Sequence, residues 1–279
     1  MNESILKIFQ RLHLGEGNLR LLNIYQGVPI AYPATIRSIS SSSIMVQTEK
    51  YQVVCLYRER ETFIQNPEFQ AVVKARVSDL YIPKLQATLT DFEYVEKGIG
   101  DRRQVRVWPK ELVTGALQFT ERSEAVTGEL ADISMDGLGI FVAEKDFSPR
   151  IFRHGRKIAI NYRLTGTFQI PLPQKYEPQY SSDPTLRFDR SQLRLSNIHT
   201  PDIDTKASTS TRLVHSPELE AQGLIANIGF DALNKRYRLG IRLLADEQYR
   251  AIVSQFVSQR QSELIQEITS LYKLLIKEA

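Results

Sequence analysis

The chain has 279 residues, of which 42% are hydrophobic and 24% charged, and its formal net charge is +4 at pH 7. This composition excludes a disordered or fibrous chain and is typical of a folded soluble protein, and the length allows two domains of ordinary size. The mild positive charge suits an anionic ligand but is too small to indicate nucleic-acid binding by itself.

The N-terminal residues 1–14 mix charged and apolar side chains and lack the apolar core of a signal peptide. No stretch of the chain is apolar for long enough to span a membrane. The only cysteine, Cys55, lies in an apolar run, so no disulfide can form within the chain and a buried core thiol is predicted. We therefore expect a cytoplasmic protein.

Residues 2–13 have the apolar spacing of a short amphipathic helix. From residue 21 to residue 95 the pattern changes to short alternating strands separated by polar turns. These strands are expected at 34–39, 43–48, 52–56, 69–81 and 86–94. Repeated short strands predict a small β-barrel, so we place a first domain at residues 1–96 and a linker at 97–101.

The linker is followed by the sequence R-R-Q-V-R, in which Arg102 and Arg106 are four positions apart and Arg103 lies between them. A guanidinium can hold a phosphate through two parallel hydrogen bonds, donate to a guanine edge or stack on a base. Glycines before the motif and Pro109 after it argue against a stable helix. The segment can therefore wrap around a ligand.

A second motif, D-I-S-M-D-G at residues 132–137, precedes an apolar run that reads as a strand. The carboxylate of Asp132 can only accept hydrogen bonds, which suits the N1–H and amino group of guanine, and the hydroxyl of Ser134 can add a further bond. Gly137 allows a tight turn or a close approach of the backbone to a ligand.

In this order and at this distance, the two motifs resemble the R-x-x-x-R and D-x-S-x-x-G motifs of the PilZ family, whose members bind the bacterial second messenger cyclic di-GMP. The run R-Y-R-L-G-I-R-L-L at 236–244 is similar to the closing strand of a PilZ barrel. The alternative interpretation is a surface arginine pair plus an ordinary Asx or Ser turn in a β-domain. The resemblance implies a site formed by Arg102, Arg106, Asp132, Ser134 and Gly137, with Arg103 and Gly139 as candidate additional contacts.

The N-terminal layout resembles the domain that precedes PilZ in flagellar-brake type proteins. That resemblance implies that the ligand-binding arginines lie at the domain junction, where a ligand can shift the relative orientation of the domains. Asp101 stands where many family members carry an extra arginine. Because that position is thought to influence whether one or two ligand molecules stack in the site, the stoichiometry stays open.

The PilZ-like domain is placed at residues 101–245, with a polar insertion at about 165–222 that is rich in Pro, Ser, Thr, Gln and Asp. Short strands are expected inside the insertion at 186–188 and 193–195. The barrel strands are expected at 105–108, 112–119, 125–133, 139–143, 157–164, 224–228 and 237–244. Trp108, the only tryptophan, is assigned to the core or rim of this barrel.

Asp246 is predicted to cap a long C-terminal helix that fills residues 246–279. Its first half has an apolar face that suits its own barrel, and its second half has a coiled-coil-like seam with too many apolar residues to remain in water. We expect this half to meet the N-terminal domain, a second copy or another protein. The predicted fold class is mainly β: a split-barrel-like N-terminal domain, a six-stranded PilZ barrel and this helix.

No P-loop, G-x-S-x-G, H-E-x-x-H or Cys–His arrangement occurs, which favours a protein that is not an enzyme. The scattered His154, His199 and His215 do not have metal-ligand spacing. The leading interpretation is a receptor that binds cyclic di-GMP at the domain junction, needs no cofactor, and regulates motility, adhesion or exopolysaccharide production through domain movement or a protein effector.

Two alternatives belong to other classes. One is a degenerate PilZ scaffold that acts through protein–protein contacts without nucleotide. The other is a nucleic-acid-binding barrel that uses the arginines of the first motif and Lys110. Such barrels usually carry aromatic side chains along a basic groove, and that interleaving is not seen here, so no nucleic-acid partner is expected.

Overall fold

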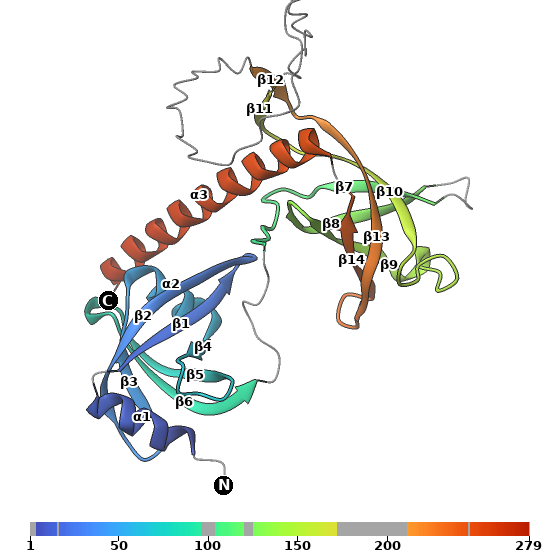
Figure 1. Cartoon of the computed structure of the whole chain (residues 1–279). Coiled ribbons are helices and arrows are strands. Elements are labelled where there is room, and N and C mark those ends of the chain that lie inside the picture. Colours follow the sequence, from blue (N-terminus) through green and yellow to red (C-terminus); the bar gives the residue numbers. More distant parts are fainter. Residues whose placement is uncertain are drawn as a thin grey trace, which may run out of the picture.

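A computed structural model describes residues 4–15, 17–95, 104–119, 125–171, 211–244 and 246–278. Within these ranges the strands form two closed six-stranded barrels, and a long helix runs beside both of them (Figure 1). The predicted fold class, mainly β with two small barrels and a C-terminal helix, is confirmed.

The first barrel has the strand order β1-β2-β3-β6-β5-β4 and closes through pairing of β4 with β1. The helix α1 packs on it, and Phe9 of α1 is fully buried against the ring of Phe69 at 5.2 Å between centroids. The elements are α1 (Ile5–Leu14), β1 (Asn18–Tyr25), β2 (Val28–Ile39), β3 (Ile44–Gln47), α2 (Lys50–Glu59), β4 (Glu61–Gln65), β5 (Val72–Tyr81), η1 (Ile82–Lys84) and β6 (Gln86–Val95).

The strand expected at residues 52–56 is wrong, because these residues lie in α2. A short continuous apolar run cannot distinguish a buried strand from a helix that is buried on more than one side, and α2 is such a helix. Leu56 packs into the core of the first barrel, whereas Val54 and Cys55 join a core shared with the second barrel. The strand β4 follows the helix, where none was predicted.

The second barrel has the strand order β10-β13-β14-β9-β8-β7. Its elements are β7 (Thr114–Gln118), β8 (Val126–Ser134), β9 (Gly137–Ala143), η2 (Glu144–Asp146), β10 (Lys157–Arg163), β13 (Glu218–Asp231) and β14 (Arg236–Leu243). The strand expected at 105–108 is reduced to a single bridge between Val107 and Ile133, because that segment leaves the barrel to contact the first domain.

The polar insertion begins and ends in paired strands. β11 (Thr167–Pro171) and β12 (Thr211–His215) form a separate two-stranded sheet, and β13 already starts at Glu218. The region outside the barrel is therefore narrower than the predicted range 165–222. The short strands expected at 186–188 and 193–195 lie outside the described residues.

The long helix α3 (Glu247–Glu278) begins where predicted, because the Asp246 side chain accepts a hydrogen bond from the Tyr249 backbone N–H at 2.7 Å. The first half of α3 packs on the second barrel. Its second half packs on α2, with Leu264 and Ile268 fully buried. Of the three expected neighbours of this seam, the structure shows the N-terminal domain. None of the described helices is long and apolar enough to cross a membrane.

One continuous hydrophobic cluster joins the two barrels and α3. From the first barrel it takes in β1 and β2 residues such as Tyr25 and Ile30, together with Val54 and Cys55 of α2. Burial raises the pKa of the Cys55 thiol to about 12, as expected for a core thiol removed from water. The barrels therefore share a core rather than meeting only through a linker.

Candidate functional site

A row of four residues crosses the outer face of the second barrel: Asp132 on β8, Gly139 on β9, Gly240 on β14 and Asn227 on β13. Register pairing places Asp132 beside Gly139, Gly139 beside Gly240, and Gly240 beside Asn227. The two middle positions are glycines and add no side chain, so the polar side chains of the row are those of Asp132 and Asn227 at its ends.

An open hollow of about 470 Å³ lies over the Gly240 and Asn227 end of this row. Three arginines line it, Arg106 from the segment before β7 and Arg238 and Arg242 from β14, against a single lining carboxylate. The complete lining is Gln104, Arg106, Ser134, Asp136, Ala226, Asn227, Arg238, Gly240, Ile241 and Arg242. A concave surface with several guanidiniums is suited to an anionic ligand that can accept many hydrogen bonds.

The carboxylate of Asp132 holds two of these arginines. Only 4% of its side chain is exposed, and its Oδ1 accepts from Arg106 Nη1 at 2.9 Å. Its Oδ2 accepts from Arg238 Nη2 in a close contact. Each guanidinium carries five N–H groups, so both arginines keep donors beyond those bonded to Asp132. Asp132 therefore sets the positions of two guanidiniums at the edge of the hollow.

Gly139 makes the pair between Asp132 and Arg238 possible. Strand β9 lies between β8 and β14, so these two side chains meet over β9. A Cβ at Gly139 would lie 2.7 Å from Asp132 Oδ2 and 3.0 Å from Arg238 Nη2. Glycine is therefore required at this position because there is no space for a side chain above the strand.

The rest of the second motif shapes the turn between β8 and β9. The buried hydroxyl of Ser134 donates to the Gly137 carbonyl oxygen at 3.1 Å. A Cβ at Gly137 would lie 2.8 Å from the Ile241 carbonyl oxygen and 3.3 Å from Arg106 Nη2. Gly137 thus allows β14 and the Arg106 side chain to approach the turn closely.

The structure brings most of the predicted site residues together around this hollow: Arg106, Asp132, Ser134, Gly137 and Gly139. Arg102 and Arg103 lie outside the described residues. Sequence reasoning missed Arg238 as a site residue, although the signal was present. In a strand, alternate residues share a face, and the run at 236–242 places Arg236, Arg238, Gly240 and Arg242 on one face.

The segment that carries Arg106 also contacts the first barrel. The Trp108 backbone N–H donates to the Gln26 carbonyl oxygen at 3.2 Å. Gly27, with φ of +88°, sits so close that a Cβ there would be 2.7 Å from the Arg106 carbonyl oxygen. The Trp108 side chain is 52% exposed, which places it at the barrel rim. The hollow therefore adjoins the contact between the two barrels.

In the described part of the chain, no group of three or more His, Cys, Asp or Glu side chains is arranged to hold a metal ion. His215 shares a hydrogen bond with the hydroxyl of Thr167, at 2.8 Å from its Nδ1. His199 lies outside the described residues.

No protein-family model and no curated protein matches the sequence. Solved structures with some similarity include YcgR from Escherichia coli in complex with c-di-GMP, with 13% identity, coverage of 96% of this chain and 94% of that chain, and a TM-score of 0.38. The inhibitor of motility MotI/DgrA of Bacillus subtilis has 13% identity, coverages of 88% and 96%, and a TM-score of 0.38. The K. pneumonia MrkH–c-di-GMP complex has 10% identity, coverages of 94% and 95%, and a TM-score of 0.39. TM-scores at this level are too low to establish a common ligand.

Proposed function

We propose that this chain is a non-enzymatic receptor of the PilZ type that binds cyclic di-GMP in the hollow lined by Arg106, Arg238 and Gly240. The observation that carries the proposal is the cluster in which Asp132 holds Arg106 and Arg238 at the edge of a concave, mainly basic surface. Cyclic di-GMP offers two phosphates and two guanines, which guanidiniums can bind through parallel hydrogen bonds, by donating to O6 and N7, or by stacking.

In this proposal the buried Asp132 orients the arginines, because both of its carboxylate oxygens already accept from guanidiniums. The remaining N–H groups of Arg106 and Arg238 then donate hydrogen bonds to the phosphates or to the guanine edge. Arg102, which belongs to the same motif, is proposed to complete the site, with Arg103 and Ser134 as further contacts. The carboxylate can accept further hydrogen bonds, but only 4% of the Asp132 side chain is exposed, so direct reading of a guanine by Asp132 would require the side chains around it to move.

Binding is proposed to act on the arrangement of the two barrels, because Arg106 is two residues from Trp108, which is hydrogen-bonded to Gln26 of the first barrel. A ligand that contacts one arrangement better than another shifts the population toward it. The resemblance in sequence motifs suggests control of motility, adhesion or exopolysaccharide production, through the domain movement or through a protein effector.

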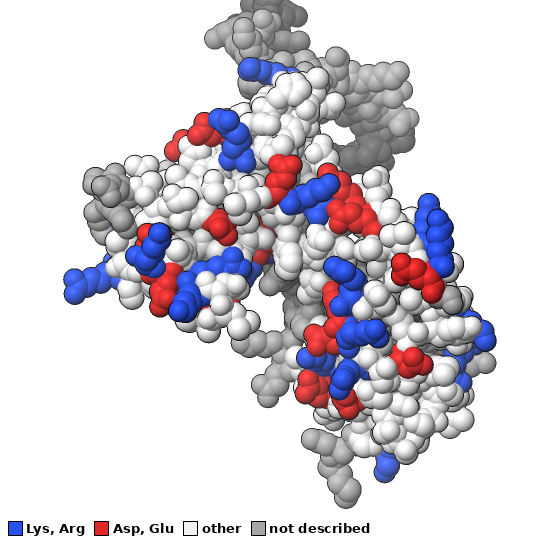
Figure 2. Space-filling model, turned by 180° about the vertical axis from the view of Figure 1, so that it is seen from behind, with Lys and Arg blue, Asp and Glu red and all other residues white. Residues whose placement is uncertain are grey.

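The charge distribution on the face shown in Figure 2 gives little support to the nucleic-acid alternative. On the face shown in Figure 2, Lys and Arg are interspersed with Asp and Glu across both barrels. Binding to a nucleic-acid backbone instead favours a continuous basic stripe or groove.

Isothermal titration calorimetry with cyclic di-GMP tests the proposal, with GTP and cyclic di-AMP as competitors of related chemistry. We expect selective binding in the micromolar range or tighter, and its stoichiometry distinguishes one bound molecule from a stacked pair. Arg106→Ala should weaken binding by about 1.5–3 kcal/mol, which is roughly tenfold to a hundredfold. Arg150→Ala, an exposed arginine outside the lining, is the matched control. Absence of binding to folded protein freed of co-purified nucleotide would refute the proposal.

A further inference from the structure

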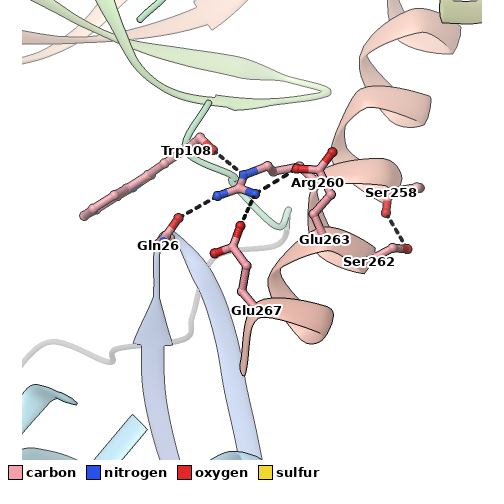
Figure 3. Close-up of polar contacts among 7 residues, drawn as sticks. All are labelled: Gln26, Trp108, Ser258, Arg260, Ser262, Glu263 and Glu267. Carbon is pink, nitrogen blue, oxygen red and sulfur yellow. Dashed lines mark hydrogen bonds and ion pairs between the residues drawn. The ribbon is translucent and has the colours of Figure 1, made fainter. Parts of the chain in front are cut away.

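Arg260, near the middle of α3, is 4% exposed although it carries a charge. Its guanidinium is held from several directions (Figure 3). Nε donates to the Trp108 carbonyl oxygen at 3.1 Å, and Nη2 donates to Gln26 Oε1 at 2.7 Å. Nη1 donates to Glu263 Oε2 at 2.8 Å and to Glu267 Oε1 at 2.9 Å. One side chain on α3 therefore bonds the turn of the first barrel and the segment that enters the second.

A buried guanidinium persists only where its charge and its N–H groups find partners. The partners of Arg260 come from three places: the β1–β2 turn through Gln26, the entry segment (residues 106–108, which lead into the second barrel) through Trp108, and α3 itself. Because the guanidinium is a rigid planar fork, the bonds to Gln26 and Trp108 can form together in only a narrow range of barrel orientations. A change of orientation would break at least one of them and leave a buried donor unpaired.

The entry segment connects this cluster to the hollow within three consecutive residues. The Arg106 side chain is paired with Asp132 at the hollow. The Val107 backbone exchanges two hydrogen bonds of 3.0 Å with Ile133 of β8. The Trp108 backbone then bonds Gln26 through its N–H and Arg260 through its carbonyl oxygen. A displacement of Trp108 is therefore passed to Arg106 through a short and doubly anchored stretch of backbone.

We propose that Arg260 is a positioning residue for the ligand site: it holds the 106–108 segment against both barrels and thereby couples barrel orientation to ligand affinity. This inference rests on the proposed function for its ligand. Coupling between two equilibria is reciprocal, so the contacts that fix the orientation also pre-organise Arg106 for the ligand. Loss of Arg260 should therefore both widen the range of relative orientations of the two barrels and weaken ligand binding.

The test measures barrel orientation and affinity on the same variants of the full chain. Cysteines introduced by Ser42→Cys in the first barrel and Lys145→Cys in the second replace exposed residues, while the native Cys55 is buried. Spin labels at these two positions report the distribution of distances between the barrels. Calorimetry with cyclic di-GMP reports affinity, and circular dichroism reports whether each variant is folded.

Arg260→Ala is expected to broaden the distance distribution and to weaken binding by about tenfold, a change of the size that coupling between two sites typically produces. Arg260→Lys keeps the charge but not the fork, so it should give an intermediate result. Arg250→Ala, an exposed arginine on the same helix, should change neither quantity. Unchanged distances and unchanged affinity in Arg260→Ala would overturn the inference.

A second variant approaches the contact from the other barrel. Gln26 has φ of +47°, a conformation that Asn tolerates well, and Gln26→Asn shortens the amide that reaches Arg260. It should reproduce the broadened distances even if Arg260→Ala does not fold, and wild-type distances in Gln26→Asn would also overturn the inference. If the wild-type chain binds no cyclic di-GMP, the proposed function fails, whereas the distance measurements still decide whether Arg260 fixes the orientation.

Discussion

Replacing Gly139 with alanine tests whether the ion pair over β9 organises the site. The added Cβ would lie 2.7 Å from Asp132 Oδ2, 2.9 Å from its Cγ and 3.0 Å from Arg238 Nη2. Gly139 does not have a positive φ, so alanine fits the backbone and the effect is confined to the space above the strand. The short Asp132 side chain is nearly buried and has little room to move aside. We therefore expect the bond to Arg238 to be lost.

The magnitude follows from the kind of bond. A hydrogen bond to a charged group contributes about 1.5–3 kcal/mol to stability, and the free energy of unfolding should fall by that amount. Gly229→Ala is the matched control: Gly229 pairs with Arg238 in the barrel register, yet a Cβ there meets nothing within 4 Å. Alanine at that position should be neutral or stabilising, because it reduces the freedom of the unfolded chain.

Urea unfolding followed by circular dichroism and by the fluorescence of Trp108 measures both variants under the same conditions. Gly139→Ala should unfold at lower urea concentration than Gly229→Ala and should bind cyclic di-GMP more weakly. If both variants have the stability of the wild-type chain, the pair between Asp132 and Arg238 does not contribute to the fold as its burial indicates. A retained pair in a structure of Gly139→Ala would refute the steric reasoning directly.

Three further predictions follow from named contacts. Arg238→Ala should lower the affinity for cyclic di-GMP by about tenfold or more, and an unchanged calorimetric affinity would remove Arg238 from the site. Burial raises the pKa of Cys55 from 9.0 to about 12, so the folded chain retains a proton that the unfolded chain loses. Its contribution to stability is therefore complete below pH 9 and falls by about 1.4 kcal/mol per pH unit up to about pH 12. Cys55→Ala should remove this part of the alkaline loss in urea midpoints measured against pH. Asp246→Ala should cost about 1 kcal/mol by removing the cap of α3, whereas Asp246→Asn should retain most of the stability in thermal unfolding.

The alternation of short strands was sufficient to predict the first barrel, because strands half-exposed on a barrel surface keep the two-residue period, whereas the second barrel was predicted from the motif resemblance together with its strand pattern. The prediction was wrong for α2, where Val54, Cys55 and Leu56 are buried on two sides by different cores. Burial on both sides removes the periodic contrast from which helix and strand are distinguished. The partner of the second half of α3 could not be predicted either, because an apolar seam does not specify which surface covers it.

The second motif could be singled out because its residues are close in sequence and each residue type has a narrow chemical role, and its part in binding a ligand stays a prediction. Arg238 was not recognised because its partner Asp132 is 106 positions away, and only the barrel topology brings β14 next to β9. The role of Gly139 was hidden for the same reason, since the side chains that need its space come from the strands on either side. Arg260 gave no local signal, because a charged residue in a helix normally indicates a solvated face.

The shared core has a consequence for the order in which the chain acquires its structure. During synthesis the first barrel can close early, since all its strands lie within Asn18–Val95. Val54 and Cys55 on its helix α2, however, are covered by a cluster that includes Leu264 and Ile268 of α3, more than two hundred residues later in the chain. Until α3 emerges, the nascent first barrel presents this apolar surface to water and to other chains. A ribosome-bound chain truncated before Glu247 should therefore be more prone to aggregation than the chain that includes α3.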